Sequence, residues 1–443
     1  MAIACGGVAP SKESRPQEGQ PAIAVGGSHT CALTSAAGVK CWGDNHWGEL
    51  GDGTTTSRLT PVAVSGLASG VQAVAANGNY TCVLTRAGGV KCWGVNTYGE
   101  LGDGTTTDRH TPVAVSGLTS GVNEIAVGEY HACALTSKGG VKCWGSNYGG
   151  ELGDGTTTDR HTPVAVSGLA SGVSAIAVGL YHTCVVASKG AVRCWGDNEV
   201  GELGDGTTTE RHIPVAVPGL ATGVTAIAAG DAHTCALTSP GGVECWGVNP
   251  SGEFGNGTTT DSSTPVAVSG LAGDVAAIVV SSSHTCTLTN EGGVECSGDN
   301  EEGQLGDGST IERHIPVAVS GLASGVTAIA AGELNTCALT SAGAVECWGF
   351  NAVGELGDGT TVDSHKPVGV IGFGGSLKCG VPNVLGTPLA KARPEIGRDH
   401  CRVGTVTRVA SQKKKNTVVG ETPRPGVRLK NGARVNLKVS RGR

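Results

Sequence analysis

Short apolar runs alternate with glycine-rich polar segments along most of this chain. Between residues 71 and 115, four such runs occupy 71–75, 80–85, 90–93 and 112–115, and clusters of Gly, Asn, Asp and Ser separate them. Alternating or β-branched runs between turn residues are typical of short strands. Because no run here keeps a helical period beyond one turn, the segment is predicted to form four short antiparallel strands.

The same pattern occurs seven times without insertion or deletion. Each copy holds two cysteines, and each of them recurs at a step of 51 residues: Cys31, Cys82, Cys133, Cys184, Cys235, Cys286 and Cys337, then Cys41, Cys92, Cys143, Cys194, Cys245, Cys296 and Cys347. A fixed period of this length indicates a propeller or a solenoid. A solenoid needs distinct capping repeats, and the first and last copies look like the rest. We therefore predict an all-β fold, with a seven-bladed β-propeller over residues 21–372.

The chain enters this repeat region on the first strand of a unit and leaves it on the last strand of a unit. The first strand is expected at 22–25 and the last at 367–370. We expect these two strands to meet in one sheet, which would close the ring and remove exposed edges.

The paired cysteines of each copy flank a predicted hairpin. In the first copy, a three-residue loop at 35–37 would set Thr34 opposite Gly38 and Cys31 opposite Cys41. Facing residues of antiparallel strands lie about 4.5–5.5 Å apart at Cα, which overlaps disulfide geometry. Two states are open for these pairs, a disulfide or two reduced cysteines packed as small core residues. The disulfide state predicts an oxidising compartment and these bonds: Cys31–Cys41, Cys82–Cys92, Cys133–Cys143, Cys184–Cys194, Cys235–Cys245, Cys286–Cys296 and Cys337–Cys347.

Residues that recur once per copy are predicted to be structural. The tryptophan that follows the second cysteine, Trp42 in the first copy and Ser297 in the sixth, is expected to pack between blades. A histidine at the position of His29 is expected to be a hydrogen-bonded core residue, with Tyr80 and Asn335 in its place in two copies. The Asp-Gly pair of GELGDGT suits a turn rather than a calcium site, because the alternating ligands of a calcium loop are missing.

Two slots vary between copies, and the aromatic residues gather near them. One slot is the turn before the first cysteine, at Gly27-Ser28 and its equivalents, and the other precedes GELG, at His46-Trp47 and its equivalents. In a four-strand meander both connections emerge at the same end, so both slots should lie on one face of the ring. Exposed aromatic clusters are typical of interaction surfaces, although tyrosines also occur incidentally on large surfaces. The predicted binding residues are Trp47, Tyr80, Tyr98, Tyr130, Tyr148 and Tyr181.

The repeated motif CALTSxGxVxCWGxNxxGELGDGTT, with a following G-V-x-x-I-A-x-G strand, resembles the regulator-of-chromosome-condensation type repeat in a bacterial, cysteine-paired form. The resemblance covers residues 21–372 and implies a seven-bladed propeller. It also implies a binding role, since propellers of this type include a secreted inhibitor of β-lactamases.

The tail, residues 377–443, differs from the repeats in charge and motif. It holds 16 Lys and Arg against 3 Asp and Glu, a net charge of +13, so the rest of the chain carries −20 within a total of −7. The order VPxVxG, a helical segment, CRVG, PxPG and a strand resembles a PASTA domain, a small α+β module. The resemblance implies a Cys379–Cys401 pair and contact with peptidoglycan or another anionic wall polymer.

The remaining features bear on location. Residues 1–20 read as a disordered lead-in without the apolar segment of a complete signal peptide, and residues 3–6 faintly resemble the end of a lipoprotein signal. No stretch approaches the length of a membrane span. The cysteine pairing and the tail together favour an extracellular or cell-surface location.

The sequence contains no recognisable catalytic constellation, so we expect neither enzymatic activity nor a cofactor or metal. The favoured function is a secreted or cell-surface binding propeller that recognises a protein, or a glycan, through one loop face. The alternative is a guanine-nucleotide exchange or chromatin-associated factor that uses the basic tail on nucleic acid. The charge of −20 and the cysteine pairs argue against that alternative. A hydrolase or lyase would rest on fold analogy alone.

Overall fold

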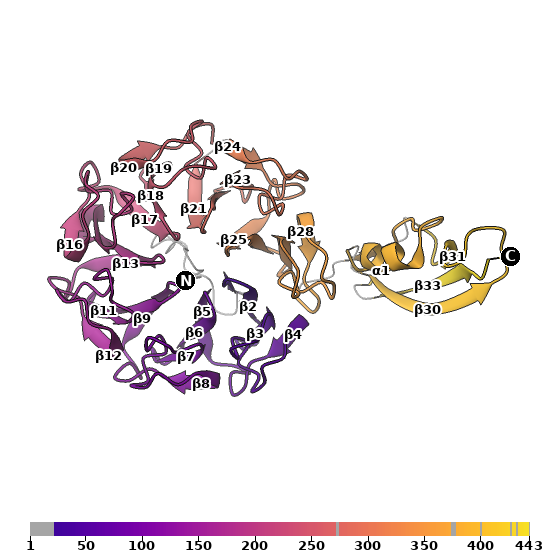
Figure 1. Ribbon diagram of the computed structural model, residues 1–443, viewed down its shortest axis with the longest axis horizontal. Coiled ribbons are helices and arrows are strands. Elements are labelled where there is room, and N and C mark those ends of the chain that lie inside the picture. Colours follow the sequence, from indigo (N-terminus) through magenta and orange to yellow (C-terminus); the bar gives the residue numbers. More distant parts are fainter. Residues whose placement is uncertain are drawn as a thin grey trace.

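Seven four-stranded antiparallel sheets form a closed ring in the computed structural model (Figure 1). The structure describes residues 22–271, 274–373, 378–398, 401–425, 428–430 and 433–442. The lead-in predicted at residues 1–20 lies outside this part. Each sheet takes its four strands from one 51-residue repeat, in chain order, which confirms the predicted seven-bladed propeller.

The blades have near-identical strand boundaries. Their strands are β1 Ile23–Val25, β2 His29–Leu33, β3 Val39–Gly43 and β4 Arg58–Ala63 in blade 1; β5 Val71–Asn77, β6 Tyr80–Thr85, β7 Val90–Gly94 and β8 Arg109–Ala114 in blade 2; β9 Val122–Val127, β10 His131–Thr136, β11 Val141–Gly145 and β12 Arg160–Ala165 in blade 3; β13 Val173–Val178, β14 His182–Ala187, β15 Ala191–Gly196 and β16 Arg211–Ala216 in blade 4; β17 Val224–Ala229, β18 His233–Thr238, β19 Gly242–Gly247 and β20 Ser262–Ala267 in blade 5; β21 Val275–Val280, β22 His284–Thr289, β23 Val294–Gly298 and β24 Arg313–Ala318 in blade 6; β25 Val326–Ala331, β26 Asn335–Thr340, β27 Val345–Gly349 and β28 Ser364–Gly369 in blade 7. A single 3₁₀ turn, Ser188–Gly190, joins β14 to β15.

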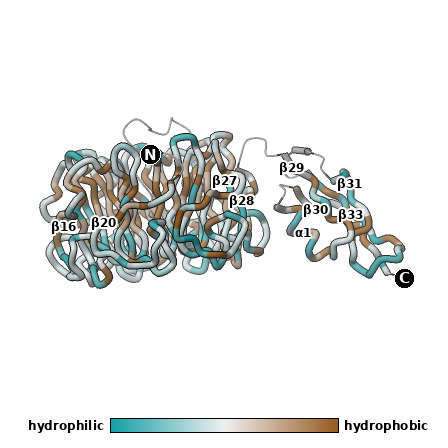
Figure 2. Tube along the Cα trace, turned by 90° about the horizontal axis from the view of Figure 1, so that it is seen from above, coloured by the Kyte–Doolittle hydropathy of each residue, from teal (hydrophilic) through white to brown (hydrophobic). Residues whose placement is uncertain are grey.

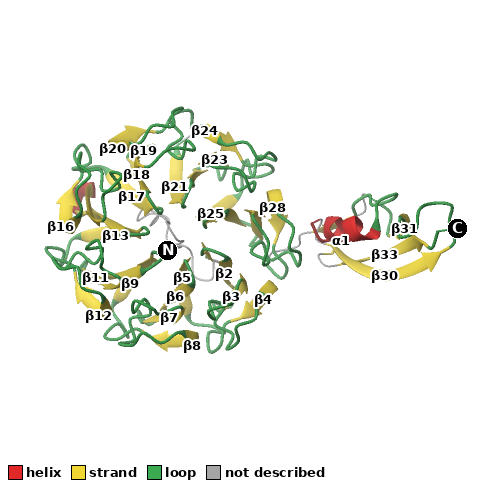
Figure 3. Ribbon diagram, viewed as in Figure 1, coloured by secondary structure: helices red, strands yellow, loops and turns green. Residues whose placement is uncertain are grey.

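The first strand of each blade lines the centre of the ring and the fourth strand forms its rim (Figures 1 and 3). The inner three strands are almost wholly buried, whereas rim strands such as β8 are half-buried or exposed. Apolar positions accordingly gather inside the disc (Figure 2). Every rim strand also carries a proline, which has no N–H for pairing with another chain.

The seam between two blades is held by the recurrent tryptophan, threonine and histidine. Between blades 1 and 2, the backbone carbonyl of Glu49 accepts hydrogen bonds from Trp93 Nε1 at 2.7 Å and from Thr81 Oγ1 at 3.0 Å. His29 Nε2 lies 2.8 Å from the same threonine hydroxyl. Burial lowers the pKa of His29 to about 4, so this imidazole is neutral. The predicted structural roles of the tryptophan and the histidine are confirmed.

The seam between blades 5 and 6 lacks the recurrent tryptophan, and a larger residue of blade 5 compensates for its absence. Ser297 replaces the tryptophan and donates only a 3.3 Å hydrogen bond to the carbonyl of Glu253. The residue after Glu253 is Phe254, and the other six blades have leucine at this position. Phe254 is fully buried in the core cluster between blades 5 and 6, and the buried residues of this cluster include no tryptophan. The larger ring thus fills part of the volume that the missing indole leaves.

The ring closes by side-chain packing, and the expectation of a shared terminal sheet is wrong. Strands β1–β4 form one sheet and β25–β28 form another, with no exchange between them. Because each repeat supplies all four strands of its own blade, no strand is left over to share. Trp42 instead donates through Nε1 to the carbonyl of Glu355 at 2.8 Å, and Thr30 Oγ1 reaches the same oxygen at 3.0 Å. The seam between blades 7 and 1 therefore has the hydrogen bonds of the other seams.

All seven predicted hairpin disulfides are present. The facing register holds in each blade, with Cys31 opposite Cys41 and Cα atoms 4.1 Å apart in blade 1. The bonds are Cys31–Cys41, Cys82–Cys92, Cys133–Cys143, Cys184–Cys194, Cys235–Cys245, Cys286–Cys296 and Cys337–Cys347. In the tail, Cys401 is disulfide-bonded, whereas the side chain of Cys379 lies outside the described residues.

The Asp-Gly turns are stabilised by local hydrogen bonds. Asp52 accepts from the N–H and hydroxyl of Thr54 at 2.8 and 2.6 Å, and Arg58 donates to its second oxygen at 2.8 Å. Equivalent Asp–Arg pairs occur in blades 2, 3, 4 and 6. Within the described ranges, no group of three His, Cys, Asp or Glu residues is placed to hold a metal ion.

The tail forms a small α+β unit. Its elements are β29 Lys378–Gly380, α1 Leu389–Arg398, β30 Cys401–Val409, β31 Val418–Thr422, β32 Arg428–Lys430 and β33 Ala433–Ser440. Strand β33 lies between β30, to which it is parallel, and the antiparallel β31. The buried core joins Ala392 and Ile396 of the helix to Val435, Leu437 and Val439 of the sheet. Across the described ranges, none of the helices has the length and apolar character to cross a membrane.

Candidate functional site: a tyrosine pocket across three blades

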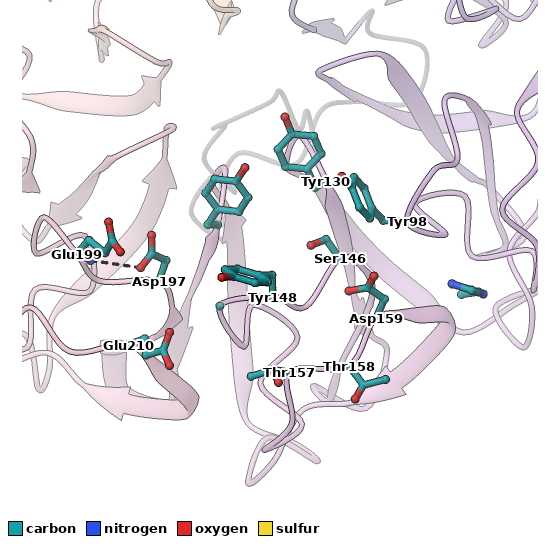
Figure 4. A pocket seen from close by; sticks show the side chains of 13 residues that line it. Tyr98, Tyr130, Ser146, Tyr148, Thr157, Thr158, Asp159, Asp197, Glu199 and Glu210 are labelled. Carbon is teal, nitrogen blue, oxygen red and sulfur yellow. Dashed lines mark hydrogen bonds between the residues drawn. The ribbon is translucent and has the colours of Figure 1, made fainter.

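Four tyrosines from three adjacent blades line one pocket of about 900 Å³ (Figure 4). Tyr98 comes from blade 2, Tyr130 and Tyr148 from blade 3, and Tyr181 from blade 4. Tyr98 and Tyr130 meet edge to face with ring centroids 5.7 Å apart, and Tyr130 stacks on Tyr181 at 5.4 Å. Because these side chains belong to both variable slots, the two slots lie on one face, as the meander predicts.

Buried polar residues fix the loops that present these rings. In blade 2, Asn96 Oδ1 accepts the N–H of Leu101 at 3.0 Å, and its Nδ2 donates to the carbonyl of Thr105 at 3.0 Å. Glu100 accepts the N–H of Tyr98 itself at 2.8 Å. The same asparagine and glutamate recur in blade 3. The backbone is thus held from beneath, and the variable side chain is left free to point outward.

The exposure of the rings differs. Tyr148 is 87% exposed, Tyr98 41% and Tyr181 36%, while Tyr130 is half-buried between its neighbours. Burial is the main cause that raises the pKa of Tyr130, with further contributions from Glu129 and Tyr181. Its phenol therefore stays neutral at physiological pH.

Two of the six predicted binding residues lie outside this pocket. Tyr80 is fully buried, and its hydroxyl donates to the carbonyl of His131 at 2.8 Å, so its assignment to a binding face is wrong. Its position in the repeat explains this, since Tyr80 lies 51 residues from both His29 and His131, at the histidine position of the seam. Trp47 is 41% exposed on blade 1 and packs edge to face on His46, but it does not line the pocket.

Four carboxylates also line the pocket, and the sequence analysis did not select them. They are Asp159, Asp197, Glu199 and Glu210. Asp159 accepts the N–H of Asn147 at 2.8 Å, Asp197 accepts that of Asn198 at 2.7 Å, and Glu210 contacts His212 at 3.1 Å. The signal was available, because Glu199 lies in the variable slot before GELG and Asp197 lies two residues ahead of it.

Three more carboxyl groups extend this acidic surface toward the centre of the ring. Glu129, Asp231 and Glu333 occupy the turn between the first and second strands in alternate blades, 3, 5 and 7. Burial raises the pKa of Asp231 to about 7, and repulsion from Glu333 and Glu129 adds to it. The pKa of Glu333 is raised for the same reasons.

Glu124 is a buried carboxyl that single-sequence reasoning overlooked. It lies on β9, is 0% exposed, and accepts a hydrogen bond from the N–H of Ile176 at 3.4 Å. Its second oxygen, Oε2, has no partner in the described part of the chain. Burial raises its pKa from 4.5 to about 8. The other six copies have alanine at this position, and that single departure was the signal.

Replacement of Glu124 by alanine is expected to stabilise the propeller by about 4 kcal/mol more at pH 8 than at pH 4.5. A carboxyl with a raised folded-state pKa contributes fully to stability below its unfolded pKa near 4.5, and this contribution is lost as pH rises through 8. This additional gain of Glu124→Ala should therefore disappear near pH 4.5. Urea denaturation of both proteins at pH 4.5 and pH 8 measures their free energies of unfolding. An equal difference between variant and unchanged protein at the two pH values would contradict the prediction.

Comparison with known proteins agrees with the fold. The model of the regulator of chromosome condensation (RCC1) repeat matches residues 39–84, 87–135, 138–186, 189–237 and 291–339. A second model of this repeat matches 22–48, 71–100, 122–151, 173–202, 224–253 and 326–355. The PASTA domain model matches residues 380–441.

Individual relatives agree with these family matches. The chain is 31% identical to the ultraviolet-B receptor UVR8 of Arabidopsis thaliana over 78% of its own length and 80% of the receptor. It is 30% identical to the human E3 ubiquitin-protein ligase HERC2 over 83% of its length, but this spans only 8% of the ligase. The solved structure of Prp20p from Saccharomyces cerevisiae superposes with a TM-score of 0.67 at 22% identity, covering 78% of this chain and 86% of Prp20p. The chain therefore belongs to the regulator of chromosome condensation (RCC1) repeat family and carries a C-terminal PASTA domain.

Proposed function

We propose that this protein is a non-catalytic binding protein that acts outside the cell or at its surface. Its propeller recognises a protein partner through the face that holds the tyrosine pocket, and its basic tail attaches it to peptidoglycan or another anionic wall polymer. The observation that carries this proposal is the pocket itself, in which four tyrosines from three blades converge.

The energetics of interfaces support the pocket as the contact. Tyrosine, tryptophan and arginine dominate the residues whose truncation weakens protein complexes most. Tyr148 and Tyr98 offer such rings to solvent on loops whose backbone is already fixed, so little ordering entropy is lost on binding. Trp47 presents an equivalent ring on blade 1 and belongs to the proposed contact.

The location is supported by covalent chemistry and by the tail. Seven disulfides form and persist in oxidising compartments. The PASTA domain match suggests a wall ligand, and the net charge of +13 favours an anionic one. Lys413, Lys414 and Lys415 lie exposed in one turn of this domain.

The alternative function rests on relatives. Prp20p was studied for its binding to Gsp1p and histones, and a basic tail can neutralise nucleic-acid phosphates. The propeller charge of −20 and the disulfides weigh against a nuclear or nucleic-acid role. Binding of this chain to duplex DNA, with a steep loss of affinity as salt increases, would favour the alternative.

One experiment with two variants tests the proposal. A chain truncated after residue 373 is expected to lose co-sedimentation with purified cell walls but to keep its capture of secreted proteins. The triple variant Trp47→Ala/Tyr98→Ala/Tyr148→Ala is expected to keep co-sedimentation with cell walls and to lose capture of secreted proteins. Aromatic anchors of this kind commonly contribute about 2 kcal/mol or more each to binding.

The control variant is Glu301→Ala/Glu302→Ala, which changes the corresponding loop of blade 6 and should retain both activities. Wall binding by the full chain should also weaken at high salt, because it depends on the tail charge. Wall binding that survives truncation, or protein capture that survives loss of the three aromatic rings, would contradict the respective half of the proposal.

A further inference from the structure

We propose that the tyrosine pocket is a cation site, which receives the guanidinium or ammonium group of an arginine or lysine side chain of the partner protein. This inference deepens the proposed function and rests on it. The pocket combines several aromatic faces with several carboxylates, and this combination decides the chemistry of what it binds.

The rings form a partial cage. Tyr130 contacts both Tyr98, with ring centroids 5.7 Å apart, and Tyr181, at 5.4 Å. In the close view, Tyr148 lies between Asp159 on one side and Asp197 on the other (Figure 4). The π faces of aromatic rings carry negative potential, and a cation within about 6 Å of a ring centroid is attracted to it. With 87% of Tyr148 exposed, this ring can close over an incoming side chain.

The charged lining has one sign. Four of the thirteen lining residues are carboxylates, one is a histidine, His161, and none is Lys or Arg. Among the described residues, Asp159, Asp197 and Glu199 form no ion pair with a basic side chain; Glu210 contacts only His212, at 3.1 Å. The carboxylates are therefore available to a cation from outside, as charge-assisted hydrogen-bond acceptors.

Other ligand classes fit less well. An anion would be repelled by the lining and by the −20 charge of the propeller region. A purely apolar group would bury carboxylates without a partner, which is costly. A basic side chain satisfies both halves of the pocket, since its stem packs on the rings and its head pairs with the carboxylates.

The test titrates hexa-arginine peptide onto the full chain by calorimetry, with hexacitrulline as its uncharged counterpart. The pocket variant Asp159→Asn/Asp197→Asn keeps the oxygen acceptors for Asn147 and Asn198 while removing two charges. The control Glu301→Gln/Glu302→Gln removes the same charge from blade 6. We expect the pocket variant to weaken hexa-arginine binding at least about tenfold, Tyr148→Ala to weaken it similarly, and the control to have little effect.

Two results would overturn the inference. One is hexacitrulline binding as tightly as hexa-arginine. The other is equal weakening of hexa-arginine binding by the pocket variant and its control, which would mean that only the electrostatic field of the whole protein attracts the peptide. Tetramethylammonium that occupies the pocket while hexa-arginine does not would overturn the assignment to a basic side chain. If the pocket variant captures the secreted partner normally and Trp47→Ala/Tyr98→Ala/Tyr148→Ala does not, the proposed function stands and the cation site fails. If both variants capture it normally, both fail.

Discussion

Reduction of the seven blade disulfides is expected to unfold the propeller at temperatures that the oxidised protein withstands. Each bond joins residues ten apart in sequence, and closing a loop of this length is worth about 2–3 kcal/mol in the chain-entropy model. Seven such contributions together exceed the usual stability of a folded domain. Thermal unfolding with and without prior reduction in denaturant measures the effect, and titration of free thiols confirms the redox state.

The same structure predicts that reductant alone, without denaturant, leaves the bonds intact. All fourteen blade cysteines are at most 1% exposed, so a reductant reaches them only when a blade opens. Removal of one bond by Cys133→Ala/Cys143→Ala provides the matched single-blade comparison, with an expected loss of about 2–3 kcal/mol. A fully reduced propeller with an unchanged melting temperature would show that the bonds are dispensable.

Trp42→Ala is expected to destabilise the protein by about 3–5 kcal/mol, the usual range for removing a buried tryptophan. Trp42 is 0% exposed, packs on Phe373 with ring centroids 5.5 Å apart, and donates to the carbonyl of Glu355. The seam it occupies has no covalent connection, because it joins the first blade to the last. Its loss should therefore open the ring as well as lower stability.

The matched variant is Trp195→Ala, at a seam whose two blades are consecutive in the chain. Trp195 is equally buried and donates to Glu151 at 2.7 Å. Both variants should lose similar free energy in urea denaturation, but only Trp42→Ala should expose β1 and β25 to hydrogen exchange under native conditions. Equal protection of these strands in both variants would mean that the seam between blades 7 and 1 does not depend on this tryptophan.

Local features of the repeat could be predicted because seven copies repeat the same signals. The period, the hairpin loop that sets Cys31 opposite Cys41, and the role of the tryptophan all follow from positions that never shift. Ring closure could not be deduced in this way. The sequence shows where strands begin and end, but whether terminal strands share a sheet depends on long-range pairing, and here complete blades leave no strand unpaired.

The site was predicted in part, for an equally physical reason. Tyr98 and Tyr148 stand in loop positions that no seam requires, so their variation indicated exposure. The assignment of Tyr80 to the binding face rested on its aromatic character. Its position in the repeat is that of the seam histidine, and this position places it in the seam. Asp197, Glu199 and Glu210 come from one loop of blade 4 and Asp159 comes from blade 3, and only the curvature of the ring brings these two loops together.

The seam that closes the ring has a consequence for how such proteins diversify. Because the contact of Trp42 with Glu355 repeats that of Trp93 with Glu49, no blade is marked as the first, and the backbone could be interrupted at any seam without loss of a strand pair. Recombination between copies, which are offset by multiples of 51 residues, would carry a loop from one sector of the face to another and keep the seams that contain the recurrent tryptophan intact. Binding specificity in this architecture can therefore change by rearrangement of whole repeats, while the scaffold that presents it stays the same.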